Sequence, residues 1–336
     1  MRDVARVAGV SQTAVSFVLN DRRDARIGEE ARARILAAVE ELDFRPDLTG
    51  RQLRLKRTQT IGLVTDSIAS SPFAGQIIRA AHDVAWESGR LVFLVNTVGD
   101  PDVEATAVRG MVDRRVDGLI YATTYVREAV ALPEMTHLPT VLVNCFPRAG
   151  STKLPAVVPA ERQGGRLAAQ RLIDAGHRRI VYLAGDEHLW ATSQRVAAFR
   201  ERMQAAGLEV APDAVRYGPY TIDSGYERAV VVLQADPRPT ALLCGNDRIA
   251  LGALLAAQAR GLKVPDDVSL VGYDDQEELA DRVRPALTTV SLPHYRMGEL
   301  GTRALLTLID GGRVPEAQEV PGQLIERDSV AAPSAM

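Results

Sequence analysis

The sequence predicts an α/β protein in which a small helical head precedes a large core of doubly wound parallel sheets. Residues 1–57 contain short amphipathic helices and carry twelve Lys or Arg against nine Asp or Glu. From Thr60 onward, short apolar runs alternate with helical stretches, which is the pattern of parallel sheets with helices on both faces. This alternation fills two successive halves of the chain. We therefore expect a core of two similar lobes.

The composition is that of a folded protein without a structural metal. The 336 residues are 46% hydrophobic and 25% charged, with a net charge of −3. The two cysteines, Cys145 and Cys244, are about a hundred residues apart, so they give neither a metal-ligand spacing nor a disulfide framework. No cleavable leader is recognisable, and no apolar run approaches the roughly twenty residues that cross a bilayer. We expect a cytoplasmic protein with no membrane contact, no metal and no cofactor.

The first stretch predicts two short helices joined by a tight turn. Residues 3–8 form the first helix, Gly9-Val10 the turn, and Ser11 caps a second helix from Gln12 to about Leu19. A third helix, from about residue 29 to 42, closes a small core, which makes the unit a helix-turn-helix. The residues expected to face that core are Val4, Ala8, Val10, Val15 and Leu19 of the first two helices and Ile35, Val39 and Leu42 of the third.

The outward face of the second helix is the candidate DNA-contacting surface. In a helix-turn-helix, the second helix enters the major groove with its N-terminal residues on the base edges. The expected partner is double-stranded DNA, contacted by Ser11, Gln12, Thr13, Ser16 and Phe17. An ordinary helical hairpin without a DNA role would contain the same two helices, so the following stretch has to distinguish the two interpretations.

The stretch RPDLTGRQLRLKRT favours the DNA interpretation. Arg45-Pro46 ends the third helix, and residues 48–55 would form a helix that is marginal in isolation, because nucleation is costly and Gly50 lies inside it. Cations that bind phosphates beside an exposed leucine are what a minor-groove wedge requires. A solvated charged linker explains the arginines but not the leucine. The candidate contacts in this linker are Arg51, Leu53 and Arg54.

The core elements follow from the apolar runs in chain order. The first half contains the strand-like runs IGLVTD, LVFLVN, DGLIYA and TVLVNC, and the second half contains RIVYLAG, AVRYG, TALLCG and VSLVGYD. Helices are expected near residues 73–88, 103–115, 163–175, 195–206, 224–234 and 247–260. The stretch LTTVSLPHYRMGELGTRALLTLIDGG is expected to return to the first lobe, with a helix from Tyr295 to about Asp310.

Polar and aromatic side chains follow the strands at their carboxyl ends, where ligands bind in such sheets. Carboxylate, amide and guanidinium groups suit vicinal hydroxyls, and aromatic rings offer an apolar face, so a carbohydrate is the expected ligand. Taken singly, a strand-end Asp or Asn is a common helix cap, and an Arg in a helix is usually solvated. The candidates are Asp66, Ser71, Pro72 and Phe73 after the first strand, and Arg195, Tyr220, Asn246, Asp247, Asp274 and Asp275 in the second half.

The chain resembles the LacI/GalR family of bacterial transcriptional regulators over nearly its whole length. The resemblance is carried by DVARVAGVSQTAVSFVLN, ARILAAVEELDFRPD, SPFAG, DAGHRRIVYLAG and RPTALLCGNDRIALGALLAAQARGLKVPDDVSLVGYDD. It implies that the second helix reads the major groove and that the linker becomes a hinge helix whose Leu53 intercalates beside Arg54. It also implies a periplasmic-binding-protein-like core, with effector contacts at Arg195, Asn246 and Asp274, aromatic contacts at Phe73 and Tyr220, and Asp247 as a helix cap.

The sequence departs from the family pattern at several positions. The family usually begins several residues earlier, with a Thr that caps the first helix, and Phe17 stands where the family has an Arg, which changes the base preference expected there. Where the family has an Asp about four residues before Gly164, this chain has Ala160 followed by Glu161. Cys145 replaces a frequent Arg. His177, in GHRRI, is interpreted as part of a helix-to-strand turn without a chemical role.

These observations predict a ligand-responsive repressor that binds a pseudo-palindromic operator. We expect a homodimer, because the tail RDSVAAPSAM lacks the leucine heptads of a tetramerising extension. The expected domains are a DNA-binding head (1–45), a hinge (46–58) and an effector core (59–336), with lobe 1 at about 59–159 and 291–321 and lobe 2 at about 160–290 and 322–330. The alternatives are a sugar receptor without a DNA function and an enzyme. The absence of GxGxxG after the first strand, of GxxxxGK[ST] and of HExxH counts against the enzyme.

Overall fold

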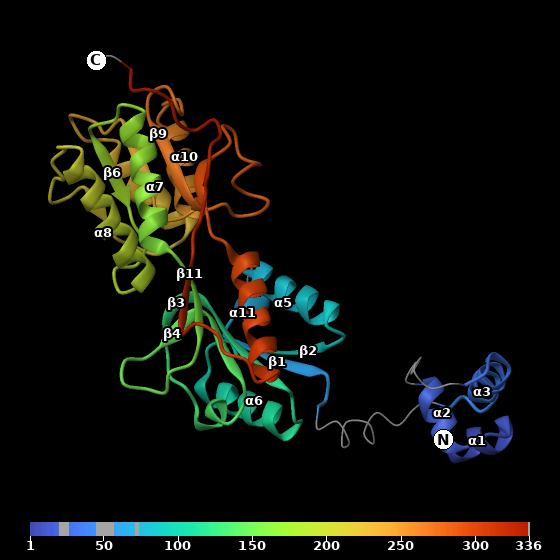
Figure 1. Cartoon of the computed structure of the whole chain (residues 1–336). Coiled ribbons are helices and arrows are strands. Elements are labelled where there is room, and N and C mark those ends of the chain that lie inside the picture. The colour runs from blue at the N-terminus through green and yellow to red at the C-terminus, as the bar shows by residue number, and fades with distance from the viewer. Residues whose placement is uncertain (20–26, 45–56, 71–73, 335–336) are drawn as a thin grey trace. The chain divides into compact units, whose positions relative to one another are not determined.

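The computed structural model describes residues 1–19, 27–44, 57–70 and 74–334. The chain forms two compact units, Met1–Thr58 and Gln59–Met336. The first contains the helical head, and the second contains both parallel sheets (Figure 1). The two units are described separately below.

The head contains α1 (Arg2–Ala8), α2 (Gln12–Leu19) and α3 (Glu29–Glu41). Gly9 ends α1 in the left-handed conformation, with φ 64°, which glycine adopts without steric cost. Ser11 Oγ accepts a hydrogen bond from the amide of Ala14 at 3.1 Å, so this serine caps the start of α2 as predicted.

Buried apolar side chains from all three helices form the core of the head. Val4, Ala8, Val15 and Ile35 are buried as expected, and Val10, Leu19 and Val39 pack against them. Leu42 is the exception: it follows the end of α3 and is 39% exposed, and Ala38, one turn earlier, is buried instead. Val18, which was not expected to face inward, is buried as well.

The first sheet of the core has the strand order β11-β5-β4-β3-β1-β2, and all of its pairings are parallel. Its strands are β1 (Thr60–Thr65), β2 (Leu91–Asn96), β3 (Gly118–Ala129), β4 (Thr140–Pro147), β5 (Ala156–Pro159) and β11 (Ala317–Val320). Its helices are α5 (Gly75–Glu87), α6 (Pro101–Asp113) and α11 (His294–Ile309), with short 3-10 turns at Ile68–Ser70 and Pro133–Thr136. These elements are called lobe 1.

The second sheet has the order β12-β10-β9-β8-β6-β7, in which only the short β12 is antiparallel to its neighbour. Its strands are β6 (Ile180–Leu183), β7 (Val215–Arg216), β8 (Ala241–Cys244), β9 (Ser269–Asp274), β10 (Thr288–Ser291) and β12 (Leu324–Ile325). Its helices are α7 (Glu161–Asp174), α8 (Trp190–Ala205), α9 (Ile222–Val232) and α10 (Asp247–Ala259). These elements are called lobe 2.

Each sheet is covered by helices on both faces. In lobe 1, α5 and α11 lie side by side on one face (Figure 1), with Ile77 and Met297 packed over Leu63. On the other face, α6 packs its Val108 and Met111 against the sheet. In lobe 2, α7 and α8 share one apolar core and α9 and α10 share another. This is the doubly wound α/β architecture that the sequence predicts.

The chain passes between the sheets after β5, after β10 and after β11. Residues 288–291 pair with β9 as a strand of lobe 2, and the return to lobe 1, expected from about residue 291, begins with Leu292 and α11. The helix expected from residue 195 begins at Trp190, and the short strands β5, β10, β11 and β12 were not predicted. Among the described residues, none of the helices combines the length and the apolar character that crossing a membrane requires.

Candidate functional site

The head presents the predicted contact residues on α2 and on its N-cap. Ser11, Gln12 and Thr13 are exposed, and Ser16 and Phe17 are half-buried. Helix α2 contains no charged residue, so any base contact from it is neutral. The linker candidates Arg51, Leu53 and Arg54 lie outside the described residues. Met1 precedes α1 and makes no side-chain capping hydrogen bond, which agrees with the missing threonine noted in the sequence.

In the core, a cavity lies between the lobes at the carboxyl ends of the strands. Its volume is about 30 Å³. Three of the predicted effector residues from lobe 2, together with Tyr220, line this cavity, as do Tyr125, Val126 and Asn144 from lobe 1. The lining residues are Thr124, Tyr125, Val126, Asn144, Glu161, Leu189, Ala191, Arg195, Tyr220, Asn246, Arg248, Asp274 and Leu292.

Asp274 is the strained and unpaired acid of this cavity. It ends β9 with φ 110°, and Asp275 follows with φ 53°, both in the region that side chains other than glycine rarely adopt. Asp274 is only 8% exposed, and its carboxylate has no hydrogen-bond partner among the described residues. Burial raises its pKa well above the usual value, and Arg195 counters that effect only in part.

Arg195 is buried and already paired, unlike a solvated helix arginine. Its Nε and Nη2 donate to the two carboxylate oxygens of Glu161 at 2.6 and 2.8 Å, and its Nη1 donates to the carbonyl of Gly245 at 2.8 Å. The guanidinium carbon lies 3.6 Å from the ring centroid of Tyr273, whose hydroxyl donates to Glu161 at 3.0 Å. A Cβ on Gly164 would lie 2.0 Å from that hydroxyl, so this position of α7 requires glycine.

Tyr220 stands across the cavity from an aromatic residue of lobe 1. Its ring stacks on Tyr125 with centroids 6.2 Å apart, and its hydroxyl is 2.8 Å from Thr192 Oγ1. A Cβ on Gly185 would lie 1.9 Å from Cζ of Tyr220, so the ring fits only because residue 185 is glycine. Tyr220 therefore contributes an aromatic ring to the lining of the cavity.

Asn246, and not Asp247 as expected, caps α10, and Asn246 also lines the cavity. Asn246 Oδ1 accepts from the amide of Ile249 at 2.9 Å, so Asn246 is the cap of α10, while its Nδ2 faces the Tyr220 carbonyl at 3.5 Å. Asp247 was expected to be the cap, but it is fully buried and accepts from Thr289 Oγ1 and from the amide of Gln276. It thereby links α10 to β10 and to the turn after Asp274.

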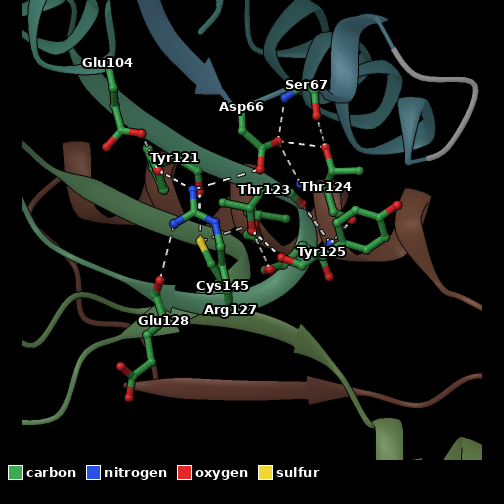
Figure 2. Close-up of polar contacts among 12 residues, drawn as sticks. Asp66, Ser67, Glu104, Tyr121, Thr123, Thr124, Tyr125, Arg127, Glu128 and Cys145 are labelled. Carbon is green, nitrogen blue, oxygen red and sulfur yellow. Dashed lines mark hydrogen bonds and ion pairs between the residues drawn. The ribbon is translucent and has the colours of Figure 1, made fainter. Parts of the chain in front are cut away.

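Lobe 1 brings a pinned bulge of β3 to the cavity. Ala122 pairs with Val143 but Arg127 already pairs with Cys145, so the residues between them leave the regular ladder. Asp66 Oδ1 accepts from both the amide and the hydroxyl of Thr124, as Figure 2 shows. Asn144 Nδ2 donates to the carbonyls of residues 123 and 124. These bonds hold Tyr125 and Val126 against the cavity.

A guanidinium remains in this region although Cys145 replaces the arginine of the family pattern. Arg127 donates to the hydroxyl of Tyr121 at 3.0 Å and lies 4.0 Å from the Asp66 carboxylate, and Tyr121 donates to Glu104 at 2.7 Å (Figure 2). Cys145 is fully buried, and burial raises the pKa of its thiol to about 12. The thiol is therefore not a nucleophile near neutral pH.

The structure thus brings Arg195, Tyr220, Asn246 and Asp274 together, while Ser71 and Phe73 lie outside the described residues. Glu161, Tyr273 and Tyr125 were not predicted as site residues. The only signal for Glu161 was its place beside the missing family Asp. No group of His, Cys, Asp and Glu side chains in the described ranges is arranged to hold a metal ion.

Two family models match the chain. Residues 1–47 match bacterial regulatory proteins of the lacI family, and residues 169–330 match a periplasmic binding protein-like domain. The HTH-type transcriptional repressor PurR of Klebsiella pneumoniae (strain 342) is 35% identical over 335 residues, which are 98% of this chain and 96% of the relative. The chain belongs to the lacI family of bacterial regulatory proteins.

Solved structures of the family share this fold. A lac repressor dimer bound to operator and the anti-inducer ONPF is 30% identical, with a TM-score of 0.82 over 98% of both chains. A complex of the transcriptional regulator CelR with cellobiose is 29% identical, with a TM-score of 0.69 over 97% of this chain and 98% of that one.

The lacI-family assignment confirms the predicted functional class, a transcriptional regulator, and the predicted α/β fold. The chain is a transcriptional regulator and not an enzyme, and the family supports DNA and a small-molecule effector as its partners.

Proposed function

We propose that this lacI-family regulator is a homodimeric repressor that binds a pseudo-palindromic operator and is controlled by a carbohydrate in the interlobe cavity. The observation that carries the proposal is Asp274, a residue only 8% exposed that lines the cavity together with Tyr220 and has no side-chain hydrogen bond to another described residue. A hydrogen bond from a ligand hydroxyl to such a buried acid is stronger than the same bond in water. The apolar face of a sugar ring packs on a tyrosine.

The hydrogen-bonding side chains that line the cavity support a ligand with several hydroxyl groups. Asp274 supplies an acceptor, and Arg195 keeps N–H groups that have no partner among the described residues. Asn246 Nδ2 has only the long contact to Tyr220. Among the relatives, CelR was solved with cellobiose. Donors and acceptors of this kind around an aromatic face suit vicinal hydroxyls.

For the DNA, we propose that residues 1–45 read the major groove through Ser11, Gln12, Thr13, Ser16 and Phe17. Residues 46–58 would form the hinge, with Leu53 as the wedge between Arg51 and Arg54. The lac repressor relative was solved on its operator as a dimer. A protein that acts on a bacterial operator works in the cytoplasm.

For the homodimer, we propose the outer edge of lobe 1 as the interface. β2 is an edge strand, yet Leu91, Phe93 and Leu94 on it are 56%, 43% and 40% exposed. Trp86 on the neighbouring α5 is also exposed. A long apolar edge that stays open invites pairing with another chain, so a second copy is the partner that fits this surface.

Selection of a random duplex pool by the purified chain at moderate salt, followed by sequencing, tests the DNA role. We expect a short palindrome with a central pyrimidine–purine step, and we expect Leu53→Ala to lose it. Absence of enrichment, also with an upstream-extended start, would contradict operator binding and favour a ligand receptor without a DNA function.

Calorimetry with a panel of monosaccharides, disaccharides and purines tests the effector class. A sugar that binds wild type and fails to bind Asp274→Ala supports the carbohydrate. Binding of a purine alone would overturn that part of the proposal. Unchanged affinity in Asp274→Ala would remove Asp274 from the site.

A further inference from the structure

The cavity is lined by Arg195, a cation whose charge is neutralised by the carboxylate of Glu161. Arg195 and Glu161 form a bidentate pair, and their side chains are 5% and 1% exposed. Both residues line the cavity. Burial disfavours the charged form of Arg195, but Glu161 outweighs this effect and raises the pKa of the guanidinium well above its usual value. The guanidinium therefore stays charged and is held by Glu161 in a bidentate pair.

The formal charges of the side chains that line the cavity sum to zero, so the lining has no net positive charge that would attract an anion. Among the described residues that line the cavity, the charged ones are Glu161, Arg195, Arg248 and Asp274. Arg248 is half-buried, and its Nε donates to Gln276 Oε1 at 3.0 Å. An incoming anion would meet Asp274, which offers it no positive charge, while the buried guanidinium of Arg195 is held by Glu161.

The pair still leaves Arg195 able to contact a neutral ligand. A guanidinium has five N–H donors. Two of those on Arg195 are used by Glu161 and one by the Gly245 carbonyl, so two have no partner among the described residues. A hydroxyl or carbonyl oxygen can accept from these without bringing a charge.

We propose that Glu161 is a specificity-determining residue that restricts the cavity to effectors without a phosphate or carboxylate group. The proposal rests on the proposed function only in placing the effector in this cavity. Glu161 follows Ala160, at the point where the sequence departs from the family pattern, so this selectivity belongs to this chain and is not carried over from the resemblance.

The test measures binding of inorganic phosphate to the full chain and to Glu161→Gln at constant ionic strength, by calorimetry and by thermal unfolding. Glutamine keeps the shape of the side chain and removes its charge, so Arg195 becomes an uncompensated buried cation. Wild type is expected to show no saturable binding through the millimolar range. Glu161→Gln is expected to bind phosphate at least about tenfold tighter than wild type.

Two further variants locate the effect. Glu201 lies on α8 and pairs with Arg162 and Arg166 of α7 at the surface, so Glu201→Gln removes the same charge from the same helix pair outside the cavity. It should behave like wild type. The double variant Glu161→Gln/Arg195→Gln should lose the phosphate binding again. Equal phosphate binding by wild type and Glu161→Gln, or none in either, would overturn the proposal.

The test also decides the case in which Glu161→Gln folds poorly. Removing one partner of a buried ion pair is strongly destabilising, and an anion that replaces the carboxylate should restore stability. Phosphate should then recover folded Glu161→Gln where sodium chloride of equal ionic strength does not. Failure of phosphate to do so would contradict the proposal. Because the assay uses neither DNA nor sugar, its outcome is independent of the operator selection and of the sugar panel.

Discussion

At the scale of single residues, the strained backbone angles and the buried charged groups of this regulator lie around one cavity. Asp274 and Asp275 have positive φ, Asp247 and Asp274 are buried acids, and Arg195 is a buried cation. Strain and buried charge of this kind persist only where the surrounding structure determines them. Asp247 is the member of this group that can be tested without a ligand.

We expect Asp247→Asn to flatten the pH dependence of stability. Burial raises the pKa of Asp247 from 3.8 to about 7, so between these values the folded chain binds more protons than the unfolded chain does. Stability in wild type therefore falls as pH rises through this window, by at most about 1.4 kcal/mol per pH unit from this group. Asparagine can accept from the Gln276 amide and donate to Thr289 Oγ1, so the fold is kept.

Thermal unfolding midpoints from pH 4 to pH 8 measure this effect as the difference between wild type and variant. The exposed Asp223→Asn on α9 controls for the loss of one negative charge. A wild type and an Asp247→Asn variant with parallel pH profiles would show that Asp247 does not titrate in this window.

Sequence reasoning located Arg195, Asn246 and Asp274 because ligands in parallel sheets gather at strand ends, a rule that needs only the strands. It could not assign their partners. Whether Arg195 is solvated or paired depends on the packing of α7 against α8, and the bond from Tyr273 to Glu161 joins residues 112 positions apart. Asn246 and Asp247 are both suitable caps, and only the geometry of the turn after β9 decides between them.

At the scale of elements, the bulge of β3 is the device that brings lobe 1 to the cavity. DGLIYA marked the strand in the sequence, but the bulge depends on the pairing of β3 with β4 and on Asn144, which has φ 58°. The missed strands β10 and β11 include polar residues and β12 has only two residues, so they lack the continuous apolar runs that marked β6 and β8, which are four residues each.

We expect Thr124→Val to weaken lobe 1 by about 1 to 2 kcal/mol, because it removes the hydroxyl donor to the Asp66 carboxylate at 2.7 Å while keeping the volume of the side chain. Urea denaturation followed by the fluorescence of Trp86, which lies in lobe 1, measures the change. Thr136→Val is the control, since the Thr136 hydroxyl is exposed and donates to the Pro133 carbonyl. Equal stability of the two variants would mean that the bulge does not depend on this bond.

The apolar edge of β2 gives a second prediction at this scale. Leu94→Glu places a charge on the proposed interface, and because the side chain is already 40% exposed the monomer fold should tolerate it. We expect the variant to sediment as a monomer and to lose operator affinity, since two heads must bind together. Val231→Glu, on an exposed apolar residue of α9 in lobe 2, should remain a dimer. A dimeric Leu94→Glu would place the interface elsewhere.

At the scale of the whole core, aromatic contacts close the two lobes on each other. Tyr125 stacks on Tyr220, and Phe146 of β4 packs on Trp190 of α8 with ring centroids 5.4 Å apart. Gln76 of α5 also donates to Glu277 across the lobes. Because residues of both lobes line the cavity, we expect effector binding and lobe closure to be coupled.

We expect Phe146→Ala to shift that equilibrium toward the open form. An aromatic pair contributes about 0.5–1.5 kcal/mol beyond its buried area, so its loss changes the ratio of open to closed forms by roughly two- to tenfold. Small-angle scattering should report a larger radius of gyration. Trp190 fluorescence should shift toward that of a solvated indole.

Tyr226→Ala removes an exposed ring from α9, in the same lobe as Trp190. It should change neither the radius of gyration nor the Trp190 fluorescence. By linkage, a shift in lobe closure must change effector affinity and operator affinity together if both sites read the same equilibrium. Phe146→Ala could change the radius of gyration and the Trp190 fluorescence as predicted and still leave operator affinity unchanged. That result would show that the head does not respond to lobe closure.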